Sequence, residues 1–204
     1  MEKIKLTKGE LKKQRDALKQ YERYLPTLQL KKQQIQMEIL YQLNLLEEKR
    51  NSLEAKKKAS YSWAGLLSEA VFSKDWVRPD NLVTRVKNIA GVDIPVFEKL
   101  EFIPAEYDLF YTPLWLDGAI DSVRNLISLS REIKLMEEGV SILKHELRIT
   151  NQRVNLFEKV KIPQTKEAIR LIKIYIGDQM TNAVGRSKIA KNKIENNMLE
   201  GAFV

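Results

Sequence analysis

The chain has 204 residues, 44% hydrophobic and 30% charged, a composition that excludes an intrinsically disordered protein and fits one large domain or two small ones. It contains no cysteine, which excludes disulfides, thiol nucleophiles and zinc–thiolate sites, and suits the cytosol. The net charge of +8 favours an acidic partner: nucleic acid, an anionic membrane surface or an acidic protein cavity. Residues 1–10 are charged throughout, so we expect no signal peptide, and no apolar run is long enough to span a bilayer.

A helix is predicted to begin near Lys8. Thr7 and Glu10 have the spacing of a capping box, in which each side chain bonds the other residue's backbone N–H. Leu6 and Leu11 occupy the positions of a hydrophobic staple.

This helix has the apolar spacing of a coiled-coil seam, interrupted by one proline. Pro26 removes a backbone hydrogen bond and costs about 3 kcal/mol inside a helix. Because the seam keeps its phase across Pro26, we expect a kink near Tyr24 and Leu25 rather than a break. The seam residues are Leu11, Leu18, Tyr21, Leu25, Leu28, Ile35 and Ile39, with a less regular continuation through Leu43, Leu46 and Leu53.

The middle of the chain changes character. Residues 60–72 are expected to continue as a helix, with one apolar side made of Trp63, Leu67, Ala70 and Val71. Residues 78–81 have the composition of a turn. Residues 82–90 and 92–102, which flank Gly91, predict a strand pair, and Pro95 implies an edge or a bulge. After a loop, Thr112 and Pro113 predict an N-cap and the first residue of a long helix.

A second seam organises the chain over residues 126–157. Thr150 occupies its one polar position, and Gly139, just outside it, weakens the helix by about 1 kcal/mol relative to alanine. The seam residues are Leu126, Leu129, Ile133, Met136, Val140, Leu143, Leu147, Val154 and Phe157.

The two seams have matched lengths and lie at opposite ends of the chain. We therefore predict a mainly α fold: a long antiparallel two-helix coiled coil of the N- and C-terminal segments, with a small central region containing a β-hairpin. The expected divisions are an N-terminal coiled-coil helix (1–72), a central loop and hairpin region (73–112), and a C-terminal coiled-coil helix with a basic tail (113–204). The alternative is that each seam pairs with another copy of the chain.

The end of the chain is expected to be less regular. Pro163 should interrupt the C-terminal helix after Phe157, and an apolar helical stretch follows from Ile169 to Ile176. Beyond Gly177 the residues are polar and basic, with a thin apolar stripe. We expect a helix that either frays or is held by a partner. The stripe is Ile189, Ile194 and Met198.

Catalytic motifs are missing from the sequence. His145, the only histidine, falls on the outer face of the heptad, which predicts a solvated residue. There is no phosphate-binding glycine loop and no nucleophile elbow. The lysines at 56–58 fit a solvated helix face better than a phosphate contact, and the three tryptophans fit a small core near the middle segment. We therefore predict no catalytic residue, cofactor or metal site.

Three stretches together resemble one family. The first is Leu-Thr-Lys-Gly-Glu-Leu-Lys at 6–12, and the second is Val-Lys-Asn-Ile-Ala-Gly-Val at 86–92 with Pro95. The third is Arg-Ile-Thr-Asn-Gln-Arg-Val-Asn-Leu-Phe-Glu at 148–158, followed by Ile162 and Pro163. Each is similar to a segment of the D subunit of the V-type (vacuolar and archaeal-type) ATPase and ATP synthase. The matches span nearly the whole chain in the right order.

The resemblance implies a non-catalytic central rotor shaft. Its two ends would lie inside the ring of alternating catalytic A and B subunits. Its middle segment would point towards the membrane, where it would meet the small F subunit of the stalk and the funnel-shaped cap of the ion-carrying ring. Such a shaft would be cytoplasmic and peripheral to the membrane, within a membrane-bound complex, with no direct contact to nucleotide.

Three polar residues beside the second seam are the candidate partner contacts. Asn151, Arg153 and Asn155 are expected to hydrogen-bond either the surrounding ring or, equally, the partner helix, where they would fix register. The basic ends, residues 3–19 and 186–193, would face the ring cavity. Two rival functions stay open: an adaptor or tethering coiled coil that homodimerises through the same seam, and a basic nucleic-acid-binding hairpin. Acidic residues interleaved along both helices argue against the second.

Overall fold

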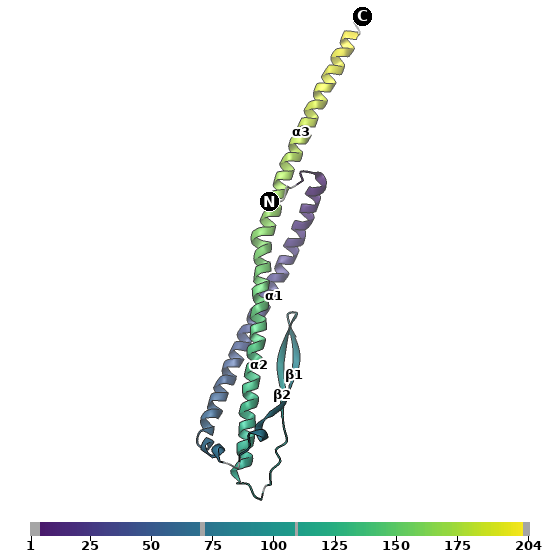
Figure 1. Cartoon of the computed structure of the whole chain (residues 1–204). Helices are drawn as coiled ribbons and strands as arrows, with labels where there is room; N and C mark the ends of the chain where they lie inside the picture. Colours follow the sequence, from purple (N-terminus) through teal and green to yellow (C-terminus); the bar gives the residue numbers. More distant parts are fainter. Residues whose placement is uncertain (1–4, 70–71, 109, 202–204) are drawn as a thin grey trace. The chain divides into compact units, whose positions relative to one another are not determined.

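The computed structural model describes residues 5–69, 72–108 and 110–201, with side chains described as far as residue 196. Its contacts divide the chain into two units. Unit 1 combines Met1–Gln29 with Gln152–Val204, and unit 2 is Leu30–Asn151. Over the described residues there are three α-helices, α1 (Lys8–Ser60), α2 (Trp115–Asn155) and α3 (Ile162–Gly201), and one hairpin of β1 (Pro79–Ile89) and β2 (Val92–Phe102), as Figure 1 shows. The same residues include two 3-10 turns, η1 (Ala64–Ser68) and η2 (Lys74–Val77), and a π-helical turn, η3 (Leu156–Lys161).

Helix α1 begins at Lys8, as predicted, but its capping box is only half formed. The backbone N–H of Glu10 donates to Oγ1 of Thr7 at 3.2 Å. The Glu10 carboxylate accepts from Nε2 of Gln14 at 2.9 Å, one turn further along, so the predicted return bond to Thr7 is replaced. The helix then continues through Pro26 without a break.

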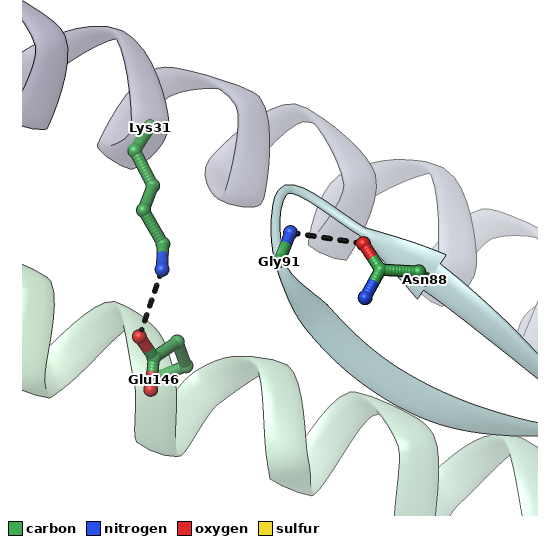
Figure 2. A network of polar contacts seen from close by, with 4 residues as sticks. All are labelled: Lys31, Asn88, Gly91 and Glu146. Atoms are coloured by element: carbon green, nitrogen blue, oxygen red, sulfur yellow. Dashed lines mark hydrogen bonds and ion pairs between the residues drawn. The ribbon is translucent and has the colours of Figure 1, made fainter.

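The coil predicted from the two seams is present within one chain. In unit 2, Lys31 pairs with Glu146 at 3.1 Å and Lys49 with Glu132 at 2.9 Å. As the residue number increases along α1, the number of the residue that it contacts on α2 decreases. Figure 2 shows Lys31 and Glu146 reaching towards one another from the two helices. The helices are therefore antiparallel.

The hairpin has the short turn that its sequence favours. Ala90 and Gly91 both have positive φ, at 52° and 76°, which matches the right-handed twist of a two-residue hairpin. The backbone N–H of Gly91 donates to Oδ1 of Asn88 at 3.1 Å, as Figure 2 shows. Gly91 adopts this conformation without steric cost, whereas Ala90 does so under strain.

One detail of the predicted hairpin was wrong, whereas the edge position implied by Pro95 is confirmed. Residues 79–81, expected to form a turn, lie in β1, and the ladder absorbs them with a register shift between Pro79 and Asn81. A second shift falls between Val83 and Thr84, whereas Pro95 pairs regularly with Val86. In a sheet of two strands both strands are edges, so a proline is tolerated without a bulge.

The hairpin packs on the helix pair through the start of β2. Ile94 is 3% exposed and joins Val92 in a buried cluster with α1 and α2 residues, namely Ile35, Ile39 and Leu143. Gly139 of α2 lies at this contact, because a Cβ placed there would be 3.9 Å from the Ile94 Cβ and from the Pro95 carbonyl oxygen. The glycine that weakens the helix in the sequence therefore lies where the hairpin approaches α2.

The connection between α1 and the hairpin is longer and less helical than predicted. Helix α1 ends at Ser60, and the 3-10 turn η1 replaces the expected continuation; Ala70 and Val71 lie outside the described residues. A second cluster forms here around Val77, Leu116 and Ile120, with Trp76 and Trp115 packed against it. These two tryptophans form part of a small core, as the sequence predicted.

Helix α2 begins at Trp115, later than the predicted N-cap. The hydroxyl of Thr112 donates to the carbonyl oxygen of Asp108 at 2.9 Å, and so belongs to the preceding turn. Arg124 then ties α2 to the ends of the hairpin. Its guanidinium donates to the carbonyl oxygens of Trp76 at 2.6 Å and Ile103 at 2.8 Å.

In unit 1 the start of α1 packs against η3 and α3. The rings of Tyr21 and Phe157 lie 5.3 Å apart, and Lys166 pairs with Glu22 at 3.6 Å. The interruption predicted after Phe157 takes the form of a widened turn: α2 ends at Asn155, the π-helical turn η3 precedes Pro163, and the chain continues as α3. The buried residues of α3 are Thr165, Ala168, Ile169 and Ile172.

Candidate partner-contacting surface

The predicted seam residues divide into two groups by burial. All of them lie on the helices of the coil, where the closest packing is in unit 2, at Ile35 and Leu143, both 0% exposed. The buried group is Ile35, Leu129, Ile133, Val140, Leu143 and Val154. The half-buried group is Leu11, Leu18, Leu25, Leu28, Met136, Leu147 and Phe157. Much of the seam is therefore filled from within the chain.

Sequence reasoning omitted several core residues from this set. Leu135 is buried beside the seam, and Ile94 and Val92 cover it from the hairpin. The sequence has no periodic pattern that predicts packing of the hairpin on the coil. The alternation of Val92 and Ile94 indicates only that β2 has one apolar face. Met136 stays half-buried because it lines a groove with Gly139, Ile94 and Pro95.

The three candidate partner contacts lie next to one another near the end of α2. Arg153 and Asn155 are exposed, whereas Asn151 is half-buried. Arg153 forms no ion pair with any residue that the structure describes. Its guanidinium is therefore available to another molecule. His145, on the same helix, is exposed as predicted.

The second half of α3 is a helix without a described packing partner. Every side chain from residue 177 to 196 is exposed, including large apolar ones. Figure 1 shows α3 continuing beyond the start of α1, its packing partner in unit 1. The exposed apolar residues are Met180 (52%), Val184 (69%), Ile189 (61%) and Ile194 (56%). A helix of this kind has little to hold it in water and is typical of one that is covered in an assembly.

Comparisons with known proteins agree with this architecture. The profile of the ATP synthase D-subunit family matches residues 10–192, which include both long helical segments and the hairpin. The chain is 46% identical to the V-type ATP synthase D subunit of Borreliella burgdorferi over 95% of this chain and 96% of the relative. The chain belongs to the V-type ATP synthase D-subunit family. Other relatives with the same name include those of Chlamydia trachomatis serovar L2, at 35% identity, and Chlamydia muridarum, at 34%, each over 94% of this chain and 96% of the relative.

Two pKa shifts in this member of the D-subunit family arise from hydrogen bonds between neighbouring surface side chains. Tyr107 donates a hydrogen bond to Asp117, and this bond raises the pKa of the phenol above its ordinary value. The ion pair of Lys99 with Glu101 lowers the pKa of that carboxyl. Both sites lie on the surface, and neither pKa moves towards neutrality, where acid–base catalysis would need it.

The described part of the chain offers neither a metal-binding cluster nor a membrane span. Within residues 5–69, 72–108 and 110–201, no three His, Cys, Asp or Glu side chains gather in a way that could hold a metal ion. Over the same residues, no helix combines the length and apolarity that crossing a membrane requires.

Proposed function

We propose that this chain is the non-catalytic central rotor shaft of a V-type ATP synthase or ATPase. It would transmit torque between the catalytic hexamer of A and B subunits and the ion-carrying ring in the membrane, so that ATP turnover is coupled to ion transport. The observation that carries the proposal is α3: a helix in which every residue from 177 to 196 is exposed, joined to an antiparallel coil. Such an end suits insertion into a ring.

Charge supports the same placement of the chain's ends. Lys5 to Lys19 of the N-terminal segment and Arg186 to Lys193 of α3 are basic and exposed, apart from a few half-buried side chains; Lys3 lies outside the described residues. Polar, mobile side chains hydrate well and form weak, exchangeable contacts. A shaft that turns inside the ring of A and B subunits needs contacts that form and release, and these ends provide them.

The proposed mechanism needs no chemistry from this chain. An antiparallel pair of helices has different side chains on each of its faces, so its surface lacks rotational symmetry. As the shaft turns, each of the three catalytic interfaces meets a different face, and differential contact shifts each interface between its open and closed states. Rotation of the shaft then orders the states in sequence.

The other proposed partners would meet the middle segment. The loop that follows the hairpin lies at the end of unit 2 where α1 ends and α2 begins, with Phe110 at 97% and Leu114 at 101% exposure. Exposed apolar side chains of this size suit a protein contact. We assign this end to the small F subunit of the stalk and the funnel-shaped cap of the membrane ring, which would keep the chain peripheral to the membrane within a membrane-bound complex.

The rival functions receive less support. An adaptor that homodimerises needs a free seam, whereas Ile35 and Leu143 are fully buried within one chain. A nucleic-acid-binding hairpin needs a continuous basic stripe, whereas Glu132 and Glu137 pair with cations along the coil.

Rotation can be tested directly, because the chain has no natural cysteine. A Glu98→Cys substitution on exposed β2 gives the chain one attachment point for a bead, with the catalytic head fixed to a surface. Addition of ATP should turn the bead in one direction with three dwell positions. A head that hydrolyses ATP while the bead only fluctuates would contradict the proposal.

The contact role of Arg153 is a separate test within the same complex. Arg153→Glu should lower coupled turnover while the helicity of the isolated chain stays unchanged, because the residue is exposed. Lys144→Glu, an exposed position on the same helix, makes the same change of charge and serves as the control. Equal turnover of the two variants would assign Arg153 no contact role.

A further inference from the structure

A groove runs between the C-terminal part of α1 and the first half of α2, within unit 2. Its floor is apolar and half-buried, and its rim is cationic and exposed. We call it the cationic groove. The floor is formed by Val123, Leu126 and Ile127, and the rim by Lys57, Arg131 and Lys134.

The rim cations are unpaired within the described residues, unlike two cations elsewhere on α1. Along the same two helices, Lys49 lies 2.9 Å from Glu132, and Arg50 pairs with Glu137. None of the three rim residues takes part in an ion pair with any residue that the structure describes. The carboxylates nearest the rim in sequence, Glu54, Glu132 and Glu137, do not line the groove, and the last two are already paired with cations of α1.

Uncompensated cations in one place oppose folding through mutual repulsion. Arg131 and Lys134 are three residues apart on one helix face, where like charges destabilise the helix, and Lys57 of α1 lines the same groove. A partner that supplies carboxylates would remove this repulsion. An apolar floor between the cations also favours an apolar side chain of the partner.

We propose that the cationic groove binds an acidic amphipathic segment of a partner protein in the assembled complex. One or two apolar side chains of that segment lie on the floor, and its carboxylates meet the rim. From Val123 to Lys134 the groove follows α2 for three turns, about 16 Å at 1.5 Å per residue, which accommodates a short helix or an extended peptide.

The shape and charge of the groove favour a protein segment over other anions. A lipid surface is flat and would meet the rim charges without filling the apolar floor. Nucleic acid needs a longer basic track, and the carboxylates of Glu132 and Glu137 interrupt one beyond the groove. The proposal adds to the rotor function and does not depend on it, because a stationary subunit would bind the same segment.

A photo-crosslinker placed in the groove tests the proposal in the whole complex. Ser130→Cys gives this chain a unique thiol on the groove lining, to which a benzophenone maleimide is attached before assembly. Irradiation of the assembled ATP synthase, followed by mass spectrometry, identifies the crosslinked partner. The expected product is a peptide with at least two carboxylates within about one helical turn of an apolar residue.

Charge reversal separates electrostatic recognition from mere proximity. Arg131→Glu combined with Lys134→Glu should lower the crosslinking yield about tenfold. In the chain that keeps the native rim residues, added salt should also lower the crosslinking yield. Lys144→Glu combined with Arg148→Glu makes the same charge change on exposed positions of the same helix and should leave the yield unchanged. If the reversed pair fails to assemble, Arg131→Gln with Lys134→Gln is measured instead, with a smaller expected decrease.

Several results would overturn the proposal. They are a crosslink to lipid or nucleic acid, a crosslinked peptide without carboxylates, the absence of any crosslink, and a yield that the rim substitutions do not change. Each leaves the rotation of a bead on β2 unaffected, so failure here is distinguishable from failure of the rotor function.

Discussion

Gly139 provides a sharp test of how the hairpin packs on α2. The substitution Gly139→Ala adds one methyl group at a buried helix position. The new Cβ would lie 3.9 Å from the Cβ of Ile94 and 3.9 Å from the carbonyl oxygen of Pro95, which is ordinary van der Waals contact. The glycine is therefore not required by space, and alanine should be accepted without movement of β2.

Two stabilising contributions determine how much Gly139→Ala raises the free energy of unfolding. Alanine is better than glycine inside a helix by about 1 kcal/mol. A buried methyl adds up to about 0.8 kcal/mol. The free energy of unfolding should rise by about 1–1.8 kcal/mol, which at about 2–4 °C per kcal/mol for a chain of this size raises Tm by about 2–7 °C. Gly139→Leu should instead cost about 1–3 kcal/mol, because a larger side chain must displace the hairpin.

Urea unfolding followed by tryptophan fluorescence measures these changes, since all three tryptophans lie in unit 2 with Gly139. Gly118→Ala is the matched control, because Gly118 lies on the same helix and a methyl group added there would have no atom within 4 Å. The Gly118→Ala variant should be stabilised only by the higher helix propensity of alanine. A decrease in stability for Gly139→Ala would refute the packing argument, because it would mean that β2 and α2 approach more closely than the 3.9 Å separations in the structure.

Three further substitutions test the hairpin and its surroundings. Ile94→Ala should lower the free energy of unfolding by about 2–5 kcal/mol in urea, because Ile94 is 3% exposed and packs with Leu143; a loss under about 1 kcal/mol would contradict its core position. Ala90→Asn should raise thermal stability by about 0.5–1 kcal/mol, because Ala90 has φ of 52° and asparagine tolerates this region; equal melting temperatures would argue against strain in the turn. Tyr107→Phe should remove a pH dependence. The bond to Asp117 raises the folded-state pKa of Tyr107, so its stabilisation is complete below the ordinary tyrosine pKa of about 10 and is lost as pH rises through the folded value. The difference between the urea midpoints of the native and Phe chains should shrink in that window, and a constant difference would exclude this linkage.

The coil was predictable because its signal is local and repeated. The seam needs only the spacing of apolar residues, and the hairpin between the two seams brings them together in one chain. The turn was predictable for a similar reason, since Gly91 lies between two runs rich in β-branched residues. The buried positions Ile35 and Leu143 are seam residues that meet in one cluster.

The ends of the helices and strands, and the packing of the hairpin on α2, depend on contacts between residues that lie far apart in sequence. The start of β1 at Pro79 was missed, because turn-forming residues were drawn into the ladder by pairing with Phe102. The role of Arg124, which joins two distant carbonyl groups, has no local pattern. Gly139 was visible only as a weak point in a helix, since nothing nearby in sequence indicates the approach of Ile94.

The π-helical turn η3 shows how a local signal and a tertiary contact combine. Pro163 has no N–H for the carbonyl of Lys159, and its ring crowds that group. The backbone N–H of Ile162 donates to the carbonyl of Phe157, five residues earlier, so the helix widens just before the proline. The hydroxyl of Thr165 then donates to the carbonyl of Lys161 at 2.7 Å. Sequence identified the strained site, but a break and a widened turn both relieve such strain.

Burial beyond the proline decides between the two outcomes. A break would release Ile169 and Ile172, which are 8% and 0% exposed, from their packing in unit 1. Burying each isoleucine stabilises the fold by about 1.5–3 kcal/mol, so the pair contributes about 3–6 kcal/mol. A proline inside a helix costs about 3 kcal/mol, and the widened turn relieves part of that cost. Continuing the helix is therefore the lower-energy solution, and the ring contact of Tyr21 with Phe157 at 5.3 Å holds the turn in phase with the start of α1.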